Sequence, residues 1–115
     1  MKDAVTERVK RLLETDTPVS RNRDFDSFAG PEGGRVWRAY KTYRSLIADL
    51  LLVGRVGTRV RRASGGEGAA VEVTGLPGHA RRTTWVPASI LRALVRRVPF
   101  LRAAARRDGG AGPRR

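Results

Sequence analysis

Apolar residues recur at every third or fourth position in three stretches of the chain, a spacing that places them on one face of an α-helix. The stretches are residues 3–14, 35–52 and 87–98. The middle one has the longest apolar stripe, with polar residues on its other side, as is typical of a helix with one solvated face. Pro99 removes a backbone donor directly after the third stretch. The pattern therefore predicts two N-terminal helices and a C-terminal helix that is broken at Pro99.

Between residues 55 and 86 apolar and polar residues alternate, which is the period of a β-strand with one buried face. Three such runs, residues 55–62, 69–76 and 81–86, are separated by a glycine-rich turn and by a Pro-Gly turn. Connections this short join antiparallel neighbours. We therefore predict an α+β fold, in which the helices gather on one face of a three-stranded antiparallel β-meander.

The alternation also predicts which side chains of the strands face the helices. The covered face is expected to hold the apolar residues Val56, Val60, Val71, Val73 and Trp85. Arg55, Arg59 and Arg61 then project from the opposite face of the first strand. Either Arg81 or Arg82 joins them from the third strand, and the register decides which.

The length of 115 residues is that of one domain. We expect a single α+β domain over residues 1–107, with a loop-rich segment at 15–34 that includes a short helical turn around 24–29. The remaining residues, 108–115, are rich in glycine and arginine and are predicted to form a disordered basic tail.

The charge is large and unevenly distributed. Lys and Arg number 24 against 11 Asp and Glu, which gives a net charge of +13. Residues 1–34 hold six bases and seven acids, whereas residues 35–115 hold eighteen bases and four acids. The codon usage of a GC-rich genome is one interpretation of the preference for arginine over lysine, but such usage would not account for the net charge. A chain this asymmetric presents a positive field that attracts polyanions.

The composition and the apolar runs also indicate the cellular compartment that we expect for the protein. There is no cysteine, so disulfides and thiolate metal sites are excluded. The longest apolar run, residues 50–53, is far too short to span a membrane, and the charged N-terminus lacks the features of a secretory signal. We expect a cytoplasmic protein without stable membrane insertion, of undetermined oligomeric state.

No motif indicates catalysis, a metal or a cofactor. His79 is the only histidine and lies in a Pro-Gly-His turn, with no local nucleophile or orienting partner. Asp24 and Asp26 form a D-x-D pair, which is more typical of turn and cap residues than of a magnesium site. The glycine-rich loop at 30–34 precedes a helix but matches no phosphate-binding motif. We therefore expect a protein that is not an enzyme and needs no cofactor.

The arginines of the sheet and of the last helix are the better candidates for a function. Arginine binds phosphate with two parallel hydrogen bonds, and an unneutralised arginine cluster on a sheet is destabilising unless an anion joins it. The predicted function is a non-enzymatic nucleic-acid-binding accessory protein, with DNA or RNA left open. The predicted contact residues are Arg55, Arg59, Arg61, Arg62, Arg81, Arg82, Arg92, Arg96 and Arg97.

Three alternatives stay open at this point. The arginines can form a solvated surface that reflects codon usage alone. The protein can be an interaction or assembly module for an acidic protein, with the apolar stripe of the last helix as the docking surface. Recognition of a single strand by stacking of bases on aromatic rings has only weak support, because neither Trp37 nor Trp85 lies in an RRM-type pattern.

The order of helix, three strands and helix is similar in outline to that of the double-stranded-RNA-binding domains. The lysine-rich start of the last helix in that family has no counterpart here, so the resemblance extends to topology alone. A winged-helix arrangement is the other option. It would use the helix at 35–52 for recognition, with Arg35, Arg38 and Lys41 facing a groove, and the hairpin at 55–76 as the wing.

Overall fold

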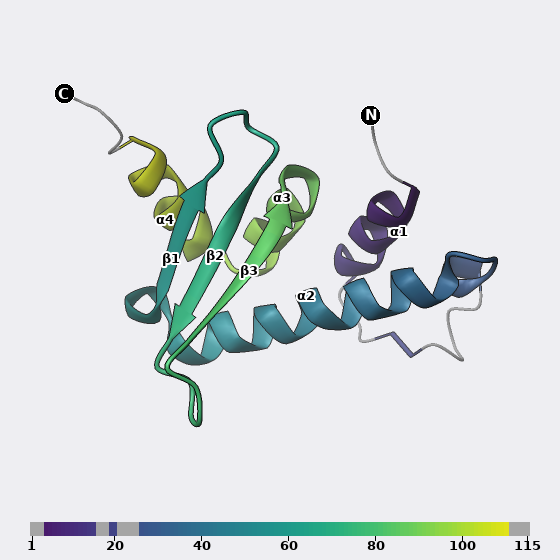
Figure 1. The fold of residues 1–115 in the computed structure, drawn as a ribbon, viewed down its shortest axis with the longest axis horizontal. Coiled ribbons are helices and arrows are strands. Elements are labelled where there is room, and N and C mark those ends of the chain that lie inside the picture. Colours follow the sequence, from purple (N-terminus) through teal and green to yellow (C-terminus); the bar gives the residue numbers. More distant parts are fainter. Residues whose placement is uncertain (1–3, 16–18, 21–25, 111–115) are drawn as a thin grey trace. The chain divides into compact units, whose positions relative to one another are not determined.

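A computed structural model describes residues 4–15, 19–20 and 26–110 of the chain (Figure 1). Its contacts divide the chain into two compact units, residues 1–45 and 46–115. The long helix α2 (Gly33–Val53) begins in the first unit and ends in the second. The predicted combination of helices with a three-stranded antiparallel sheet is confirmed.

The first unit holds α1 (Ala4–Leu13), the 3₁₀ helix η1 (Asp26–Phe28) and the start of α2. The stripe that predicted α1 is buried, at Val5, Val9, Leu12 and Leu13. The Arg8 guanidinium donates hydrogen bonds to the carbonyls of Ser27 and Ala29 at 2.5 and 2.8 Å. These bonds attach η1 and the residue that follows it to α1, across 19 and 21 residues of sequence.

An aromatic cluster forms where α2 begins. Phe28 meets Trp37 edge to face at 5.1 Å, and the hydroxyl of Tyr40 accepts a hydrogen bond from the backbone N–H of Val19 at 3.2 Å. A Cβ on Gly33 would lie 1.8 Å from the carbonyl oxygen of Phe28, so only glycine fits this approach. One turn further along α2, burial raises the pKa of the Tyr43 phenol, because the charged form loses hydration.

The second unit is built on a sheet of β1 (Thr58–Arg62), β2 (Gly68–Thr74) and β3 (Arg81–Pro87), in the order β1-β2-β3. Both pairings are antiparallel, as predicted. Val60 lies opposite Val71, which lies opposite Thr84 on the far strand. Because side chains alternate along each strand, this register assigns every residue of the sheet to one face.

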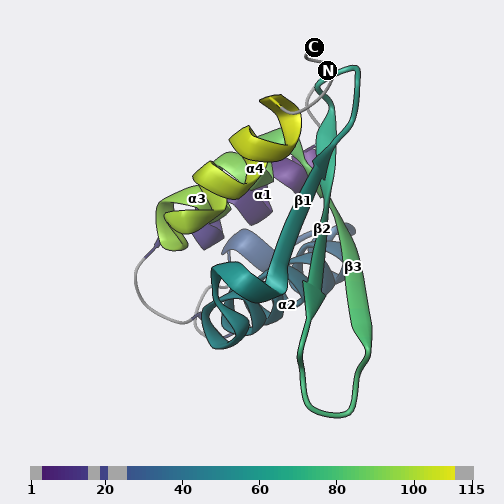
Figure 2. The same cartoon turned by 90° about the vertical axis from the view of Figure 1, so that its left-hand side faces the viewer.

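Helices cover one face of this sheet (Figure 2). α4 (Phe100–Gly110) packs mainly on β1, and α3 (Ala88–Arg97) packs on β2 and β3. Beneath them, residues of the sheet, of both helices and of the link between the helices are completely buried. These are Val60, Ala69, Val71, Val86, Leu94, Val98 and Leu101, each 0% exposed. The core of the second unit therefore lies between one sheet face and its helices.

The C-terminal part agrees with the prediction at Pro99 and departs from it further on. Val98 and Pro99 separate α3 from α4, so the C-terminal helix is broken where predicted. α4 continues to Gly110, which places residues 108–110 of the predicted disordered tail in a helix. The rest of that tail, residues 111–115, lies outside the described residues.

Two residues predicted on the covered face are not there. Gly54 adopts a positive φ of 70°, and Arg55–Gly57 form the 3₁₀ helix η2 rather than the start of a strand, which leaves Val56 96% exposed. Trp85 is 49% exposed on the opposite face, because its neighbours Thr84 and Val86 take the positions beneath the helices. Val56 was misplaced because it precedes the strand, and Trp85 was misplaced because an apolar strand residue was assumed to face the helices.

Candidate nucleic-acid interface

The face of the sheet that the helices of the second unit leave uncovered carries most of the strand arginines. We call it the open face; its residues are Arg59, Arg61, Ala70, Glu72, Thr74, Arg81, Thr83 and Trp85. The pairing arranges them in rows across the strands. One row joins Arg59, Glu72 and Thr83, and the next joins Arg61, Ala70 and Trp85. The register thus answers the question that the sequence left open, since it places Arg81, not Arg82, on this face.

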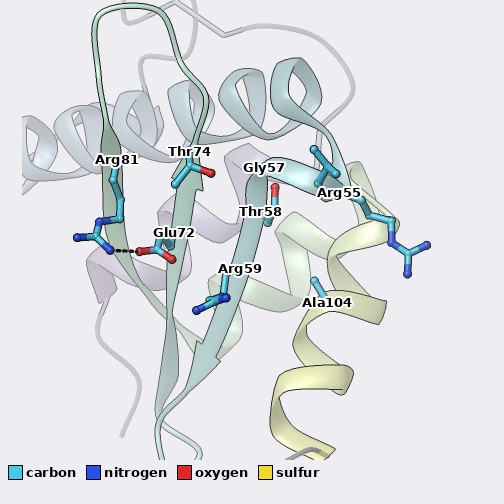
Figure 3. A pocket seen from close by; sticks show the side chains of 9 residues that line it. Arg55, Gly57, Thr58, Arg59, Glu72, Thr74, Arg81 and Ala104 are labelled. Carbon is cyan, nitrogen blue, oxygen red and sulfur yellow. Dashed lines mark hydrogen bonds and ion pairs between the residues drawn. The ribbon is translucent and has the colours of Figure 1, made fainter.

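The open face is hollowed in two overlapping places. A hollow of about 490 Å³ extends from Arg81 over Glu72 and Arg59 to Arg55, and reaches Ala104 at the edge of the sheet (Figure 3). A second hollow, of about 300 Å³, is lined by Arg59, Arg61, Ala70, Glu72, Arg81 and Thr83. Arginine side chains therefore form the walls, and the small side chains of β2 leave a shallow floor between them.

The positive charges of the open face are only partly neutralised. Arg81 donates a hydrogen bond to the Glu72 carboxylate at 3.1 Å, and this arginine side chain stays 66% exposed. In the part of the chain that the structure describes, Arg59 and Arg61 have no ion-pair or hydrogen-bond partner of their own. Three arginines against one carboxylate leave a formal charge of +2 on the open face, and Arg55 adds one more at its end.

The other predicted contact residues do not join this cluster. Arg82 lies on the covered face, where it pairs with Asp49 of α2 at 3.0 Å. Arg62 follows Val60 in the alternation and therefore also points to the covered side, exposed at the end of its strand. Arg92, Arg96 and Arg97 belong to α3, which packs on the covered face. The structure brings together Arg59, Arg61 and Arg81, while Arg55 lines the far end of the first hollow with its side chain directed away from Arg59 and Arg81 (Figure 3). It does not bring the nine predicted residues into one continuous patch.

The sequence reasoning missed Trp85 as a member of the open face. Its neighbour on β2 supplied a signal: Gly68 has no side chain, and a Cβ there would lie 2.7 Å from Cζ2 of Trp85. A strand glycine beside an exposed aromatic ring is typical of a ring that lies flat over the neighbouring backbone. The alternation along β3, with Thr84 and Val86 on the covered face, places Trp85 on the open face.

The other chemical candidates occupy separate places. His79 is exposed in the β2–β3 connection, and its backbone N–H donates to the carbonyl of Leu76 at 3.1 Å. In the glycine-rich loop, the N–H of Gly33 donates to the carbonyl of Gly30 at 3.1 Å, so this donor is already satisfied. Asp24 lies outside the described residues, and among those described no three metal-ligating side chains gather.

Within the described ranges, no helix combines the length and the apolar character that crossing a bilayer requires.

Comparisons of the chain with protein-family models, with curated proteins and with solved structures find no match. The outline similarity to double-stranded-RNA-binding domains therefore stays a similarity in the order of elements. The geometry of the open face is therefore the evidence that bears on function.

Proposed function

We propose that the second unit is a nucleic-acid-binding module that contacts phosphates through the open face of its sheet. The observation that carries the proposal is the pair Arg59 and Arg61, exposed on an uncovered sheet face with no partner among the described residues. Glu72, the one carboxylate on this face, is already engaged by Arg81. The excess positive charge is balanced most simply by a polyanion.

The spacing of the arginines fits this role. Arg59 and Arg61 are two residues apart on one strand, so their Cα atoms lie roughly 6.6 Å apart and their side chains point the same way. Two guanidinium groups held side by side can contact successive phosphates of one strand, each with two hydrogen bonds. Phosphate contacts give affinity and orientation without reading the sequence of bases. We therefore expect binding with little sequence preference.

A titration over a range of salt concentrations tests the proposal. Fluorescence anisotropy with labelled DNA and RNA, at 50 to 200 mM salt, should show affinity that falls steeply with salt. Four arginine–phosphate contacts correspond to a slope of about −3 in log affinity against log salt. Absence of binding at low salt, or an affinity indifferent to salt, would contradict the proposal.

Two matched double variants locate the contact. R59Q/R61Q removes two charges from the open face, and R92Q/R102Q removes two exposed charges from α3 and α4. Both lower the net charge by the same amount. Contact through the open face predicts that R59Q/R61Q reduces the magnitude of the salt slope by about 1.5, whereas R92Q/R102Q leaves it nearly unchanged. Equal effects would indicate attraction by net charge alone.

Removal of acids gives the converse test. Glu72→Gln releases Arg81 on the open face, and Asp49→Asn releases Arg82 on the covered face; each raises the net charge by one. We expect Glu72→Gln to tighten binding about threefold, and Asp49→Asn to change it less, because charges more than a Debye length from the ligand are screened. The opposite order would place the contact elsewhere.

A protein-interaction module is the second candidate, and one observation favours it. Leu51, Leu52 and Val56 are 60%, 68% and 96% exposed where α2 leads into η2, an apolar surface of the kind that protein contacts use. The docking surface expected on the last helix is not available, because Ile90, Leu91 and Leu94 are buried in the unit's own core. A partner captured after nuclease treatment and lost in Leu52→Ser/Val56→Ser would support this candidate.

A further inference from the structure

Trp85 is the one tryptophan of the second unit, and the open face displays it beside the arginines. It lies on β3 opposite Ala70, which in turn lies opposite Arg61 on β1. The side chain is 49% exposed, an unusual position for the largest apolar residue of a small domain. Ala70 between the two side chains is small, so nothing on β2 rises between the indole and the guanidinium of Arg61.

The indole is held in place from one side. Cζ2 of its six-membered ring lies beside Gly68, where an added Cβ would be 2.7 Å from that atom. Gly68 itself is buried. An aromatic ring that is fixed against a strand loses little conformational freedom when a second ring stacks on it, which favours binding. The exposed half of Trp85 is therefore a preorganised apolar surface.

We infer that the open face binds single-stranded nucleic acid, with a base stacked on Trp85 while the adjoining phosphates contact Arg59 and Arg61. Bases inside a duplex stack on each other and offer no free face, whereas unpaired bases do. Stacking on an aromatic residue beside a basic groove is the general mode of single-strand binding, and it tolerates any base. The inference rests on the proposed function and adds to it the class of nucleic acid.

Three ligands of equal length separate the contributions of bases and phosphates. They are a single-stranded oligonucleotide, an abasic oligonucleotide with the same phosphates, and a duplex. Wild-type protein should bind the single strand about 5- to 100-fold more tightly than the abasic strand, the range that one stacked base gives. The abasic ligand tests stacking on unaltered protein, so a folding defect cannot account for the result.

Variants of Trp85 then assign the stacking residue. Trp85→Leu should lose the preference for the single strand over the abasic strand, and Trp85→Phe should keep most of it, because phenylalanine retains a π-face. The salt slope should be the same in both, since no charge changes. In a Trp37→Phe background, the fluorescence of Trp85 should be quenched by the single strand and not by the abasic strand.

The outcomes separate stacking on Trp85 from phosphate binding by the open face. Salt-dependent binding with equal affinity for single-stranded and abasic ligands, or a preference for the duplex, would overturn the stacking inference and leave phosphate binding by the open face standing. No salt-dependent binding of any of the three ligands would overturn both. A preference for the single strand that Trp85→Leu retains would also overturn the role given to Trp85.

Discussion

The two faces of the sheet consist of alternate residues of the same three strands, yet they differ in almost every property. On the covered face Val60, Val71 and Val86 are completely buried beneath α3 and α4. On the open face, Arg59, Arg61 and Arg81 are exposed above a floor of small side chains. A period of two is enough to put the stabilising residues and the candidate binding residues one position apart along the chain.

The ion pairs refine this comparison. Each face has one arginine–carboxylate pair of similar length, Arg82–Asp49 at 3.0 Å and Arg81–Glu72 at 3.1 Å. The open face differs because two arginines, Arg59 and Arg61, are left over once that pair is made, whereas Arg62 is the only strand arginine left over on the covered side of the described sheet. A surplus of charge, rather than its presence, therefore marks the face that is suited to a polyanion.

The largest expected difference between the faces is in stability. Leu94→Ala, beneath the sheet, should lower the free energy of unfolding by about 2–5 kcal/mol, because it removes buried contacts and leaves a cavity. Arg59→Ala on the open face should change it by less than about 0.5 kcal/mol, as exposed substitutions usually do. Urea titrations followed by circular dichroism measure both. A similar loss of stability in the two variants would show that Arg59 makes stabilising contacts and is not simply exposed on the open face.

Gly68→Ala tests a position of the sheet where the structure leaves no room for a side chain. A Cβ at this position would meet the carbonyl oxygen of Val86 at 2.4 Å and Cζ2 of Trp85 at 2.7 Å. Backbone must therefore move, and we expect a loss of about 1–3 kcal/mol in the free energy of unfolding. Gly34→Ala is the matched control, since its Cβ would meet only the end of Arg38 at 3.7 Å. Thermal melting should separate the two variants by several degrees.

Arg81→Gln and Arg82→Gln compare the two ion pairs. Both pairs are partly exposed, so each substitution should lower stability by no more than about 1 kcal/mol. The two variants should differ in their affinity for a polyanion. We expect Arg81→Gln to weaken that affinity and Arg82→Gln to leave it nearly unchanged. Chemical denaturation and anisotropy titrations on the same samples provide both values. Equal weakening would remove the distinction between the faces.

The smallest expected effect is the contribution of Tyr43, in the first unit, to the pH dependence of stability, and it is a control for the variants of the sheet. Burial raises the pKa of Tyr43 in the folded state, so folding stabilises its protonated form. That contribution is complete below the unfolded pKa of about 10 and is lost as the pH rises through the folded value. Tyr43→Phe should reduce the alkaline loss of stability, seen in melting curves from pH 8 to 11. The reduction should be the same in variants of either sheet face.

Much of the secondary structure could be predicted because periodicity is a local property. The stripe at residues 35–52 gave α2 to within two residues at each end, and the turn signals gave three strands in the right order. Val56 was misplaced because Gly54 and a 3₁₀ turn precede β1, and alternation cannot be counted across them. Trp85 was misplaced because an apolar residue at a strand position was assumed to face the core.

The candidate site was predicted only in part for a related reason. Sequence marked nine arginines, but charge gives no information on which face of the sheet or which layer each one occupies. The pairing of β2 with β3 placed Arg81 on the open face and Arg82 opposite it, beside Asp49. The packing of α3 on the covered face then separated Arg92, Arg96 and Arg97 from the strand arginines.

The sequence by itself determined the α+β class, the antiparallel sheet and the strong positive charge of the chain beyond residue 34, because these follow from local periodicity and composition. Tertiary structure alone decided which arginines gather and where Trp85 points. Register and layer packing are set by contacts between residues far apart in the chain, such as Arg82 with Asp49 and Trp85 with Gly68. A shift of one residue in the register of a strand would move all side chains of that strand to the other face of the sheet.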